Sequence, residues 1–350
     1  MHRLADLIEA NIEKLAKLES IAMGQPIGVA KVFLGICPPG WRYYAGFADK
    51  IGGKLVVEAG FPPGVINFVS GARETGQLLA AHMNINKISF TGSIMAGRKV
   101  QEAATKSNLK RVTLELGGKS PSIVFNDANM DTAIAQASQG FLLNSGQVCA
   151  AGSRTYVQEE IAPKFIEALK AQFEGFAGAM GDPTDEQTYL GPLADVTQFD
   201  RVMKYLEIGK QDAQLLTGGS RKGDTGNFIE PTIFMDPPSN SKIYTEEIFG
   251  PVMVVKTFKT EEEVIAMANK TSYGLAAYLH TTDVTRALRV SAELEAGTVY
   301  VNGNFWVTPN TPFGGWKQSG NGSRESGKAG LMSYLEAKTI MISMNTPAKA

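Results

Sequence analysis

The chain has 350 residues, of which 43% are hydrophobic and 20% charged, and its formal net charge is −1. This length favours about two domains with a sizeable core, and the balanced charge offers no surface for nucleic acid or an anionic membrane. No apolar run approaches the roughly 18 residues that cross a bilayer, and Asp6, Glu9 and Glu13 interrupt any signal-peptide core. The two cysteines, Cys37 and Cys149, allow at most one disulfide. We therefore expect a soluble protein of a reducing compartment, the cytoplasm.

The N-terminal part is predicted to be helical with an interruption. Apolar residues at three- and four-residue steps predict an amphipathic helix over residues 4–18. Glycine and proline are frequent in residues 21–40, which we expect to be irregular, and a second, shorter helix is predicted over residues 41–51.

From residue 65 onward, short apolar runs alternate with helical patterns, which favours an α/β fold with a mostly parallel sheet covered on both faces. The predicted helices cover residues 74–82, 96–106, 132–143, 163–176, 195–209, 261–269 and 284–294. The predicted strands cover residues 65–69, 87–91, 111–116, 122–125, 154–158, 227–234, 252–258, 276–280, 298–302 and 338–344. The last of these has no helix after it, so it is either a plain edge strand or a strand that adds to another subunit's sheet.

Two candidate reacting groups lie within residues 113–154. Glu115 closes an apolar strand, and Cys149 follows in a small loop flanked by glycine. A thiol attacks carbon as the thiolate, so its ordinary pKa of roughly 8.5 must be lowered or a base must take its proton. Glu115 is the candidate base. Taken singly, Cys149 could equally be a small buried hydrophobe and Glu115 a helix cap. The three histidines are far apart in the sequence, which argues against a metal site.

Three further segments each have a structural and a functional interpretation. Residues 90–97 place two glycines between a strand and a helix, where backbone N–H groups attract phosphate, although such turns also carry glycine for steric reasons. Residues 244–251 hold adjacent acids, then Phe249 and Gly-Pro. One acid could bind ribose hydroxyls while the ring backs a heterocycle, or the acids could open a helix with Phe249 in the core. Residues 305–315 form an aromatic loop that could line an apolar pocket or be a packed connection.

Together these motifs resemble the aldehyde dehydrogenase superfamily, in particular its hydrolytic NAD(P)-dependent type. They occur in the family's order and at about its spacing, and the resemblance extends from the first helix to Lys338. The motifs are residues 114–120 (LELGGKS), 146–149 (GQVC), 246–251 (EEIFGP) and 312–315 (PFGG).

The resemblance implies an aldehyde dehydrogenase-like α/β fold in three parts. Residues 1–117 would form a Rossmann-like parallel-sheet NAD(P)-binding domain that is incomplete, and residues 118–319 the catalytic domain with the nucleophilic cysteine. Residues 320–350 would return to the cofactor domain and end in an oligomerisation strand. A homo-oligomer, dimer or tetramer, is implied, with an aldehyde as the small-molecule substrate. An apolar tunnel for this aldehyde is suggested by Phe141, Leu142, Phe305 and Trp306.

The resemblance also implies roles for individual residues. Cys149 would attack the aldehyde to give a thiohemiacetal, hydride would pass to the nicotinamide, and Glu115 would activate water to hydrolyse the resulting thioester. The cofactor is expected to be NAD, with NADP left open. The implied cofactor-binding residues are Gly92, Ser93 and Gly97 under the pyrophosphate, Leu116 near the carboxamide, Glu247 at the nicotinamide ribose and Phe249 beside the ring.

The chain also departs from the family. Lys54 runs almost directly into residues 55–57, whereas the family has a long segment there, and the family's N-terminal lead-in is absent. The missing segment would hold a Pro-Trp-Asn motif, whose asparagine donates to the oxyanion, and a lysine strand that binds the adenosine ribose. Losing one oxyanion donor costs roughly 10²–10³ in rate. The alternative hypothesis is therefore a catalytically impaired remnant, or a mis-spliced gene model, that acts only in binding or subunit assembly.

Overall fold

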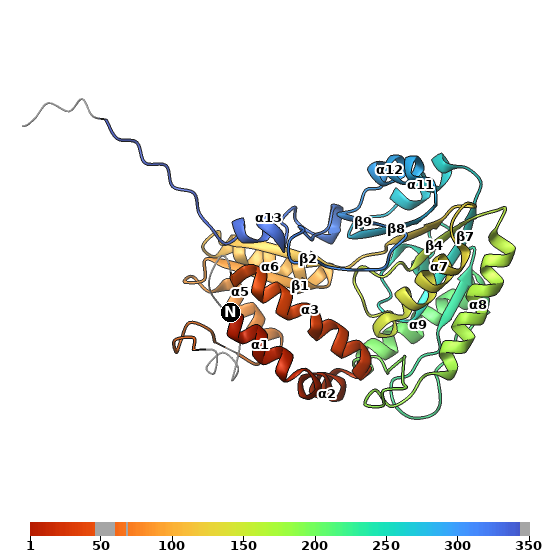
Figure 1. Cartoon of the computed structure of the whole chain (residues 1–350), viewed down its shortest axis with the longest axis horizontal. Helices are drawn as coiled ribbons and strands as arrows, with labels where there is room; N and C mark the ends of the chain where they lie inside the picture. Colours follow the sequence, from red (N-terminus) through yellow and green to blue (C-terminus); the bar gives the residue numbers. More distant parts are fainter. Residues whose placement is uncertain (46–59, 68, 344–350) are drawn as a thin grey trace, which may run out of the picture.

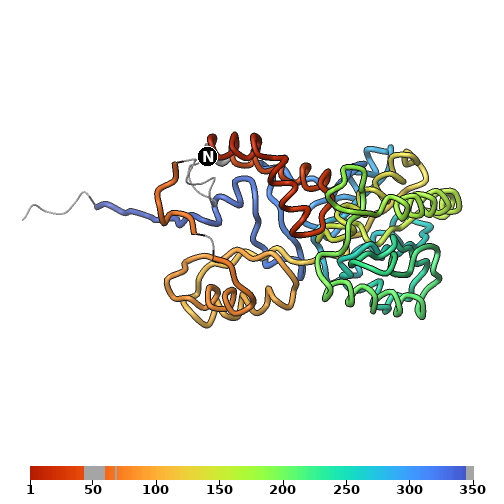
Figure 2. The backbone as a smooth tube through the Cα atoms, turned by 90° about the horizontal axis from the view of Figure 1, so that it is seen from below, coloured from red at the N-terminus to blue at the C-terminus, as the bar shows by residue number. Residues whose placement is uncertain are grey.

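The computed structural model describes residues 1–45, 60–67 and 69–343. Two lobes are visible, one around strands β1 and β2 and a larger one around the main sheet, with helices α1 to α3 along one side (Figure 1). The same separation is seen after a quarter turn (Figure 2). The predicted α/β class is confirmed.

Three N-terminal helices pack together: α1 (His2–Ala10), α2 (Ile12–Met23) and α3 (Ile27–Ala45). The single helix predicted over residues 4–18 is interrupted at Asn11, whose side-chain amide donates to the Leu7 carbonyl at 2.8 Å. α3 is held to α1 by Arg42, which pairs with Asp6 at 2.7 Å and Glu9 at 2.5 Å.

The prediction of an irregular segment over residues 21–40 is wrong, because most of it belongs to α3. Ile27, Ala30 and the partly buried Leu34 pack with Ala16 in a small apolar cluster. The tertiary packing of this face overrides the helix-breaking tendency of Pro38 and Pro39, which lie inside the helix.

The smaller lobe contains a parallel two-stranded sheet. It is built from α5 (Arg73–Ala81), β1 (Lys87–Gly92), α6 (Ile94–Lys106) and β2 (Arg111–Leu116). The register places Lys87 beside Arg111 and Gly92 beside Leu116. β2 therefore ends beside the turn that begins α6.

The strand predicted over residues 65–69 is wrong for its described residues: residues 65 and 66 form a bend, and residues 67 and 69 have no regular secondary structure. Val65 and Val69 are 39% and 65% exposed, and no described strand lies beside them to accept their backbone groups. A strand needs such a partner, so an apolar run alone does not form one. The point after Lys54, where the family is expected to have a longer segment, lies outside the described residues.

The larger lobe is a seven-stranded sheet in the order β5-β6-β7-β4-β3-β8-β9. All its pairings are parallel except that of β5 with β6. The strands are β3 (Pro121–Val124), β4 (Arg154–Gln158), β5 (Gln214–Thr217), β6 (Thr232–Met235), β7 (Val252–Phe258), β8 (Ala276–His280) and β9 (Thr298–Val301).

Helices cover both faces of this sheet, as a parallel sheet requires. On one face lie α9 (Val196–Asp212), α11 (Glu261–Asn269) and α12 (Val284–Glu293). The other face packs on α7 (Met130–Ala135) and α8 (Ala162–Gly178). Shorter elements are η1 (Gln136–Gly140), η2 (Leu143–Gly146), α10 (Lys242–Thr245), η3 (Lys317–Ser319) and α13 (Gly327–Met332).

The two sheets fall on either side of residues 117 and 118; the predicted domain boundaries remain a prediction.

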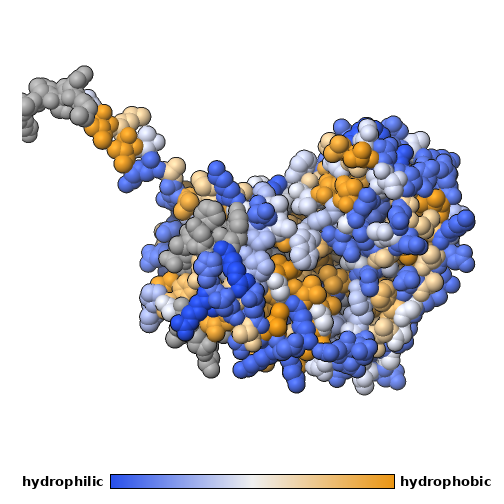
Figure 3. All heavy atoms as spheres, viewed as in Figure 1, coloured by the Kyte–Doolittle hydropathy of each residue, from blue (hydrophilic) through white to orange (hydrophobic). Residues whose placement is uncertain are grey.

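After α13 the chain leaves the body as an extended arm (Figure 1). Residues 338–343 form no strand within the chain, so the interpretation as a plain edge strand is wrong for them. Hydrophobic residues are visible along the arm (Figure 3), and Ile340, Met341 and Ile342 are 74%, 91% and 76% exposed. Pairing with another subunit remains a prediction. In the part of the chain that the structure describes, no helix is long and apolar enough to span a membrane.

Candidate active site

Glu115 is the next-to-last residue of β2, at the edge where the strand meets the larger lobe. Its neighbours Leu114 and Leu116 line a cleft against α6, so the pleat directs Glu115 to the opposite side. The side chain is 5% exposed, and neither carboxylate oxygen has a hydrogen-bond partner among the described residues. Burial, reinforced by the nearby Glu325 and opposed by Arg324, raises the pKa of Glu115 to about 8.

A strained loop leads to Cys149. Asn144, Ser145 and Gly146 have φ values of 52°, 54° and 72°, three left-handed residues in succession. A Cβ atom on Gly146 would lie 2.3 Å from the Gly250 carbonyl oxygen, so only glycine allows this approach. Strain of this kind persists where the surrounding structure fixes the backbone, which is common at functional sites.

The segment 117–120 brings the strand end, the thiol loop and Glu247 together. A Cβ on Gly118 would lie 2.3 Å from the Cys149 carbonyl oxygen, and one on Gly117 would lie 2.0 Å from Glu247 Oε2. The Gly118 N–H donates to Glu247 Oε1 at 3.2 Å. The two glycines thus allow the backbone of this segment to touch both Cys149 and Glu247.

The electrostatics also link these groups. Burial raises the pKa of the Cys149 thiol to about 11, with further contributions from the charges of Glu247 and Glu115. The backbone N–H groups of Ala150 and Cys149 act in the opposite direction. Near neutral pH the thiol is therefore protonated. Glu247 and Glu115, whose charges act on Cys149, are the carboxyl groups that can accept its proton when they are ionised.

Glu247 and Phe249 follow α10, which ends at Thr245. The interpretation of the two acids as the first turn of a helix is therefore wrong. Arg201 donates to the Glu247 carbonyl at 2.7 Å, and burial raises the pKa of the Glu247 carboxyl. Phe249 has a φ of 59° and is partly buried, with its carbonyl bound by the Gln198 amide at 2.7 Å.

The glycine-rich turn predicted to bind pyrophosphate connects β1 to α6. Ser93 caps the helix, its Oγ accepting from the Ala96 N–H at 3.3 Å, and Gly92 and Ser93 are exposed. Gly97 is buried, and a Cβ there would lie 2.6 Å from the Leu116 side chain. The close approach at Gly97 fixes the start of α6 next to the end of β2, where its free N–H groups can meet an anion.

Aromatic residues pack against the same apolar cluster as Cys149. Cys149 packs in an apolar cluster with Tyr300, Phe305 and Phe313. Their rings follow one another, with centroids 6.2 Å apart from Tyr300 to Phe305 and 6.1 Å from Phe305 to Phe313. Trp306, also expected here, is 56% exposed.

Phe141 and Leu142, which we expected beside the substrate, are core residues instead. They are 3% and 0% exposed, in the cluster between the sheet and α8, and Phe141 stacks on Phe173 at 6.1 Å. Their apolar side chains suggested a tunnel wall, whereas packing against α8 determines their position.

No sequence signal pointed to Glu325 and Arg324, which influence Glu115 from the far end of the chain. Glu325 is brought in by a backbone bridge to Phe313, with hydrogen bonds of 2.7 Å in both directions. Ser319 was also missed; its hydroxyl donates to the Gly117 carbonyl at 2.6 Å and accepts from the Gly274 N–H. Among the described residues, no cluster of three potential metal ligands occurs.

Comparison with known proteins agrees with this geometry. Residues 53–340 match the aldehyde dehydrogenase family, and the chain belongs to that family. It is 41% identical to an aldehyde dehydrogenase of Davidiella tassiana, over 98% of this chain and 82% of the relative. It is also 41% identical to the mitochondrial aldehyde dehydrogenase of Homo sapiens, over 98% of this chain and 78% of the relative.

Solved structures give the same result. The NAD-dependent aldehyde dehydrogenase of Sinorhizobium meliloti superposes with a TM-score of 0.94 at 34% identity, covering 100% of this chain and 82% of the other. Betaine aldehyde dehydrogenase of Staphylococcus aureus, in complex with NAD+, superposes with a TM-score of 0.91 at 31% identity, covering 96% of this chain and 80% of the other. The sequence alignments run over 404 to 410 positions, more than the 350 residues of this chain, so the relatives carry residues without a counterpart here.

Proposed function

We propose that this chain oxidises an aldehyde to its carboxylic acid with NAD, using Cys149 as the nucleophile and Glu115 as the general base. The observation that carries the proposal is the buried carboxylate of Glu115, whose two oxygens have no partner among the described residues and whose charge acts on Cys149. A buried acid without a hydrogen bond is costly to retain, and a base poised near neutral pH is a reason to retain it.

In the first step the Cys149 sulfur forms a bond to the carbonyl carbon, and the thiol proton passes to Glu115. The carbonyl π electrons move to the oxygen, giving the anion of a thiohemiacetal. The Cys149 backbone N–H is the available donor to that oxygen, since the family's asparagine is absent. When bound, the cofactor supplies the hydride acceptor that converts the adduct to a thioester.

In the second step Glu115, its proton released to solvent, takes a proton from water. The resulting hydroxide attacks the thioester carbon, the C–S bond breaks, and the thiolate leaves with the electron pair. The product is a carboxylic acid. A carboxylate in this role favours hydrolysis over transfer to a thiol cosubstrate.

The residues proposed to hold the cofactor fit it in position and chemistry. Exposed N–H groups at the start of α6, beyond Gly92 and Ser93 and fixed by Gly97, would hold the pyrophosphate. Glu247 would accept from the nicotinamide ribose hydroxyls, Phe249 would lie beside the ring, and the Leu116 backbone would meet the carboxamide. NADP remains open beside NAD.

We place the protein in the cytoplasm, as a homo-oligomer. Both cysteines are free, which agrees with a cytoplasmic, reducing environment. The exposed apolar arm of residues 338–343 supports a homo-oligomer in which the arm adds to a partner's sheet.

The test is NADH formation with a panel of aliphatic and aromatic aldehydes. The enzyme concentration is set to detect turnover roughly 10³-fold below that of a relative with the oxyanion asparagine. We expect aldehyde-dependent NADH that disappears in Cys149→Ala and persists in Cys37→Ala. The alternative, a chain that binds or assembles without turnover, is favoured by the two-stranded sheet of the smaller lobe. Absence of NADH with every aldehyde would support it.

A further inference from the structure

The peptide group between Gly117 and Gly118 is held at both of its ends. Its carbonyl oxygen, on Gly117, accepts from the Ser319 hydroxyl at 2.6 Å, and its N–H, on Gly118, donates to Glu247 Oε1 at 3.2 Å. A trans peptide is planar, so the carbonyl and the N–H point in opposite directions from one rigid unit. A contact that fixes the direction of the carbonyl therefore also fixes the direction of the N–H that reaches Glu247.

The direction in which the Ser319 hydroxyl donates is set by its two neighbours. The side chain is fully buried, and its Oγ also accepts from the Gly274 N–H at 3.0 Å. An N–H group can only donate and a carbonyl can only accept, so the hydroxyl proton points to Gly117. Among the described residues, no other group donates to the Gly117 carbonyl, which is buried.

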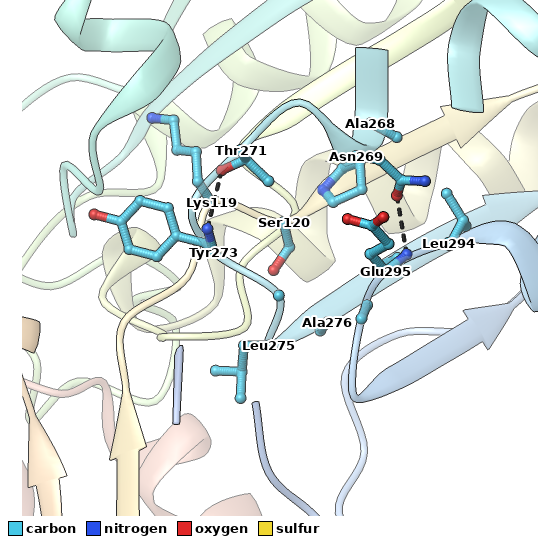
Figure 4. A pocket seen from close by; sticks show the side chains of 14 residues that line it. Lys119, Ser120, Ala268, Asn269, Thr271, Tyr273, Leu275, Ala276, Leu294 and Glu295 are labelled. Atoms are coloured by element: carbon cyan, nitrogen blue, oxygen red, sulfur yellow. Dashed lines mark hydrogen bonds between the residues drawn. The ribbon is translucent and has the colours of Figure 1, made fainter. Parts of the chain in front are cut away.

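A loop of the larger lobe, residues 272–275, contacts both Ser319 and Glu247. The Gly274 N–H of this loop binds Ser319, and its Tyr273 phenol accepts from the Glu247 N–H at 3.4 Å. Figure 4 shows the cavity of about 10 Å³ that residues 273–275 line together with the two residues that follow the peptide group, Lys119 and Ser120. The loop and the peptide group are therefore direct neighbours, and Ser319 bridges them.

The two glycines make the orientation of this peptide group easy to reverse. Half a turn of the peptide plane would move Gly118 from a negative to a positive φ, which glycine adopts without strain. The Gly117 carbonyl would then face the Glu247 carboxylate, and the hydrogen bond from the Gly118 N–H would be lost. The hydrogen bond from Ser319 opposes this reversal, because it holds the carbonyl on the other side.

We propose that Ser319 is a positioning residue that directs the Glu247 carboxylate at the cofactor ribose through the peptide group 117–118. The inference rests on the proposed function, in which Glu247 accepts from that ribose. Donation by Ser319 polarises the peptide carbonyl, and a polarised peptide group donates a stronger hydrogen bond from its N–H. The hydroxyl, the peptide group and the carboxylate thus form one chain of hydrogen bonds in which each bond strengthens the next.

The test is a double-mutant cycle on the dissociation constant of NAD+, measured for the full chain by equilibrium titration. Ser319→Ala removes the hydroxyl, and we expect NAD+ to bind roughly tenfold more weakly, as for the loss of one buried hydrogen bond. In the Glu247→Ala background the same substitution should change the dissociation constant by less than about twofold, because the residue through which Ser319 acts is gone. A purely structural role of Ser319 would weaken binding equally in both backgrounds.

Ser138→Ala is the matched control. Ser138 is also fully buried, and its hydroxyl donates to the Ile134 carbonyl at 2.7 Å, without a contact to segment 117–120. This variant should bind NAD+ as the unaltered chain does. Ser319→Cys keeps the size of the side chain but donates more weakly, so it should weaken binding less than Ser319→Ala. If Ser319→Ala does not fold, Ser319→Cys takes its place in the cycle, with the same two outcomes.

Two results would overturn this proposal alone: an unchanged dissociation constant in the folded Ser319 variant, or equal losses of affinity in the two backgrounds. The proposed role of Glu247 has its own test in the same experiment. If Glu247→Ala binds NAD+ as tightly as the unaltered chain, or the unaltered chain does not bind NAD+, that role fails, and the proposal for Ser319 fails with it.

Discussion

Glu115 shows how one residue can combine a stability cost with a chemical use. Burial holds its pKa at about 8, far above the ordinary carboxyl value of 4.5. At neutral pH most molecules therefore carry the protonated acid, which is the lower-cost form in this environment. The base form, required to accept a proton from Cys149 or from water, increases as the pH rises through 8.

Thioester hydrolysis should accordingly rise with pH to a plateau above about 8. In Glu115→Gln this rise of the rate with pH should be absent, and the hydrolysis rate should be lower by roughly 10²–10⁴-fold. Single-turnover rates between pH 6 and 10 measure this directly. If the rate of Glu115→Gln still rises with pH, another group is the base, and Glu325 would be the first candidate.

At the scale of elements, the thiol loop depends on the backbone conformation at Gly146. Gly146→Ala would place a Cβ 2.3 Å from the Gly250 carbonyl oxygen at a φ of 72°. We expect a loss of about 2 kcal/mol or more in the free energy of unfolding, together with lower Cys149 reactivity, because the loop must shift.

Gly175→Ala is the matched control for that substitution. Gly175 lies in α8, and an added Cβ there would have no heavy atom within 4 Å, so alanine should stabilise the helix by about 0.5–1 kcal/mol. Denaturant unfolding of both variants checks the pair. Equal effects of the two substitutions would contradict the role assigned to the loop.

Elements with local signals were predictable from sequence, and those determined by distant contacts were not. The helices over 261–269 and 284–293 begin where Thr260 and Asp283 accept from backbone N–H groups, as their sequences indicate. By contrast, α3 forms across Pro38 and Pro39 because its apolar face is buried, and residues 65–69 lack a partner strand.

The site residues also divide into those that the sequence could suggest and those that it could not. Glu115 and Cys149, the proposed base and nucleophile, could be proposed from motifs, because each stands in a short run of characteristic residues. Glu325 and Arg324 could not, because their effect on the pKa of Glu115 arises from proximity in three dimensions.

At the scale of the whole molecule, the exposed arm is the feature that a single chain leaves unexplained. Removing residues 338–350 should lower the mass of the particle in solution to that of the monomer, because the arm's apolar residues would no longer pair with a partner's sheet. Light scattering coupled to size-exclusion chromatography measures this. The charge-introducing variant Met341→Lys should act in the same direction, and an unchanged mass for both would contradict the role of the arm.

The central claim is that Cys149 carries the substrate through a thioester that Glu115 hydrolyses. Its most direct test is intact-protein and peptide mass spectrometry of Glu115→Gln after incubation with an aldehyde and NAD+, since slow hydrolysis should preserve the intermediate. The account predicts one acyl group per chain, on the peptide containing Cys149, absent without NAD+ and absent in Cys149→Ala. A protein that forms NADH while Cys149 remains unacylated, or that acquires the acyl group at Cys37 instead, would contradict it.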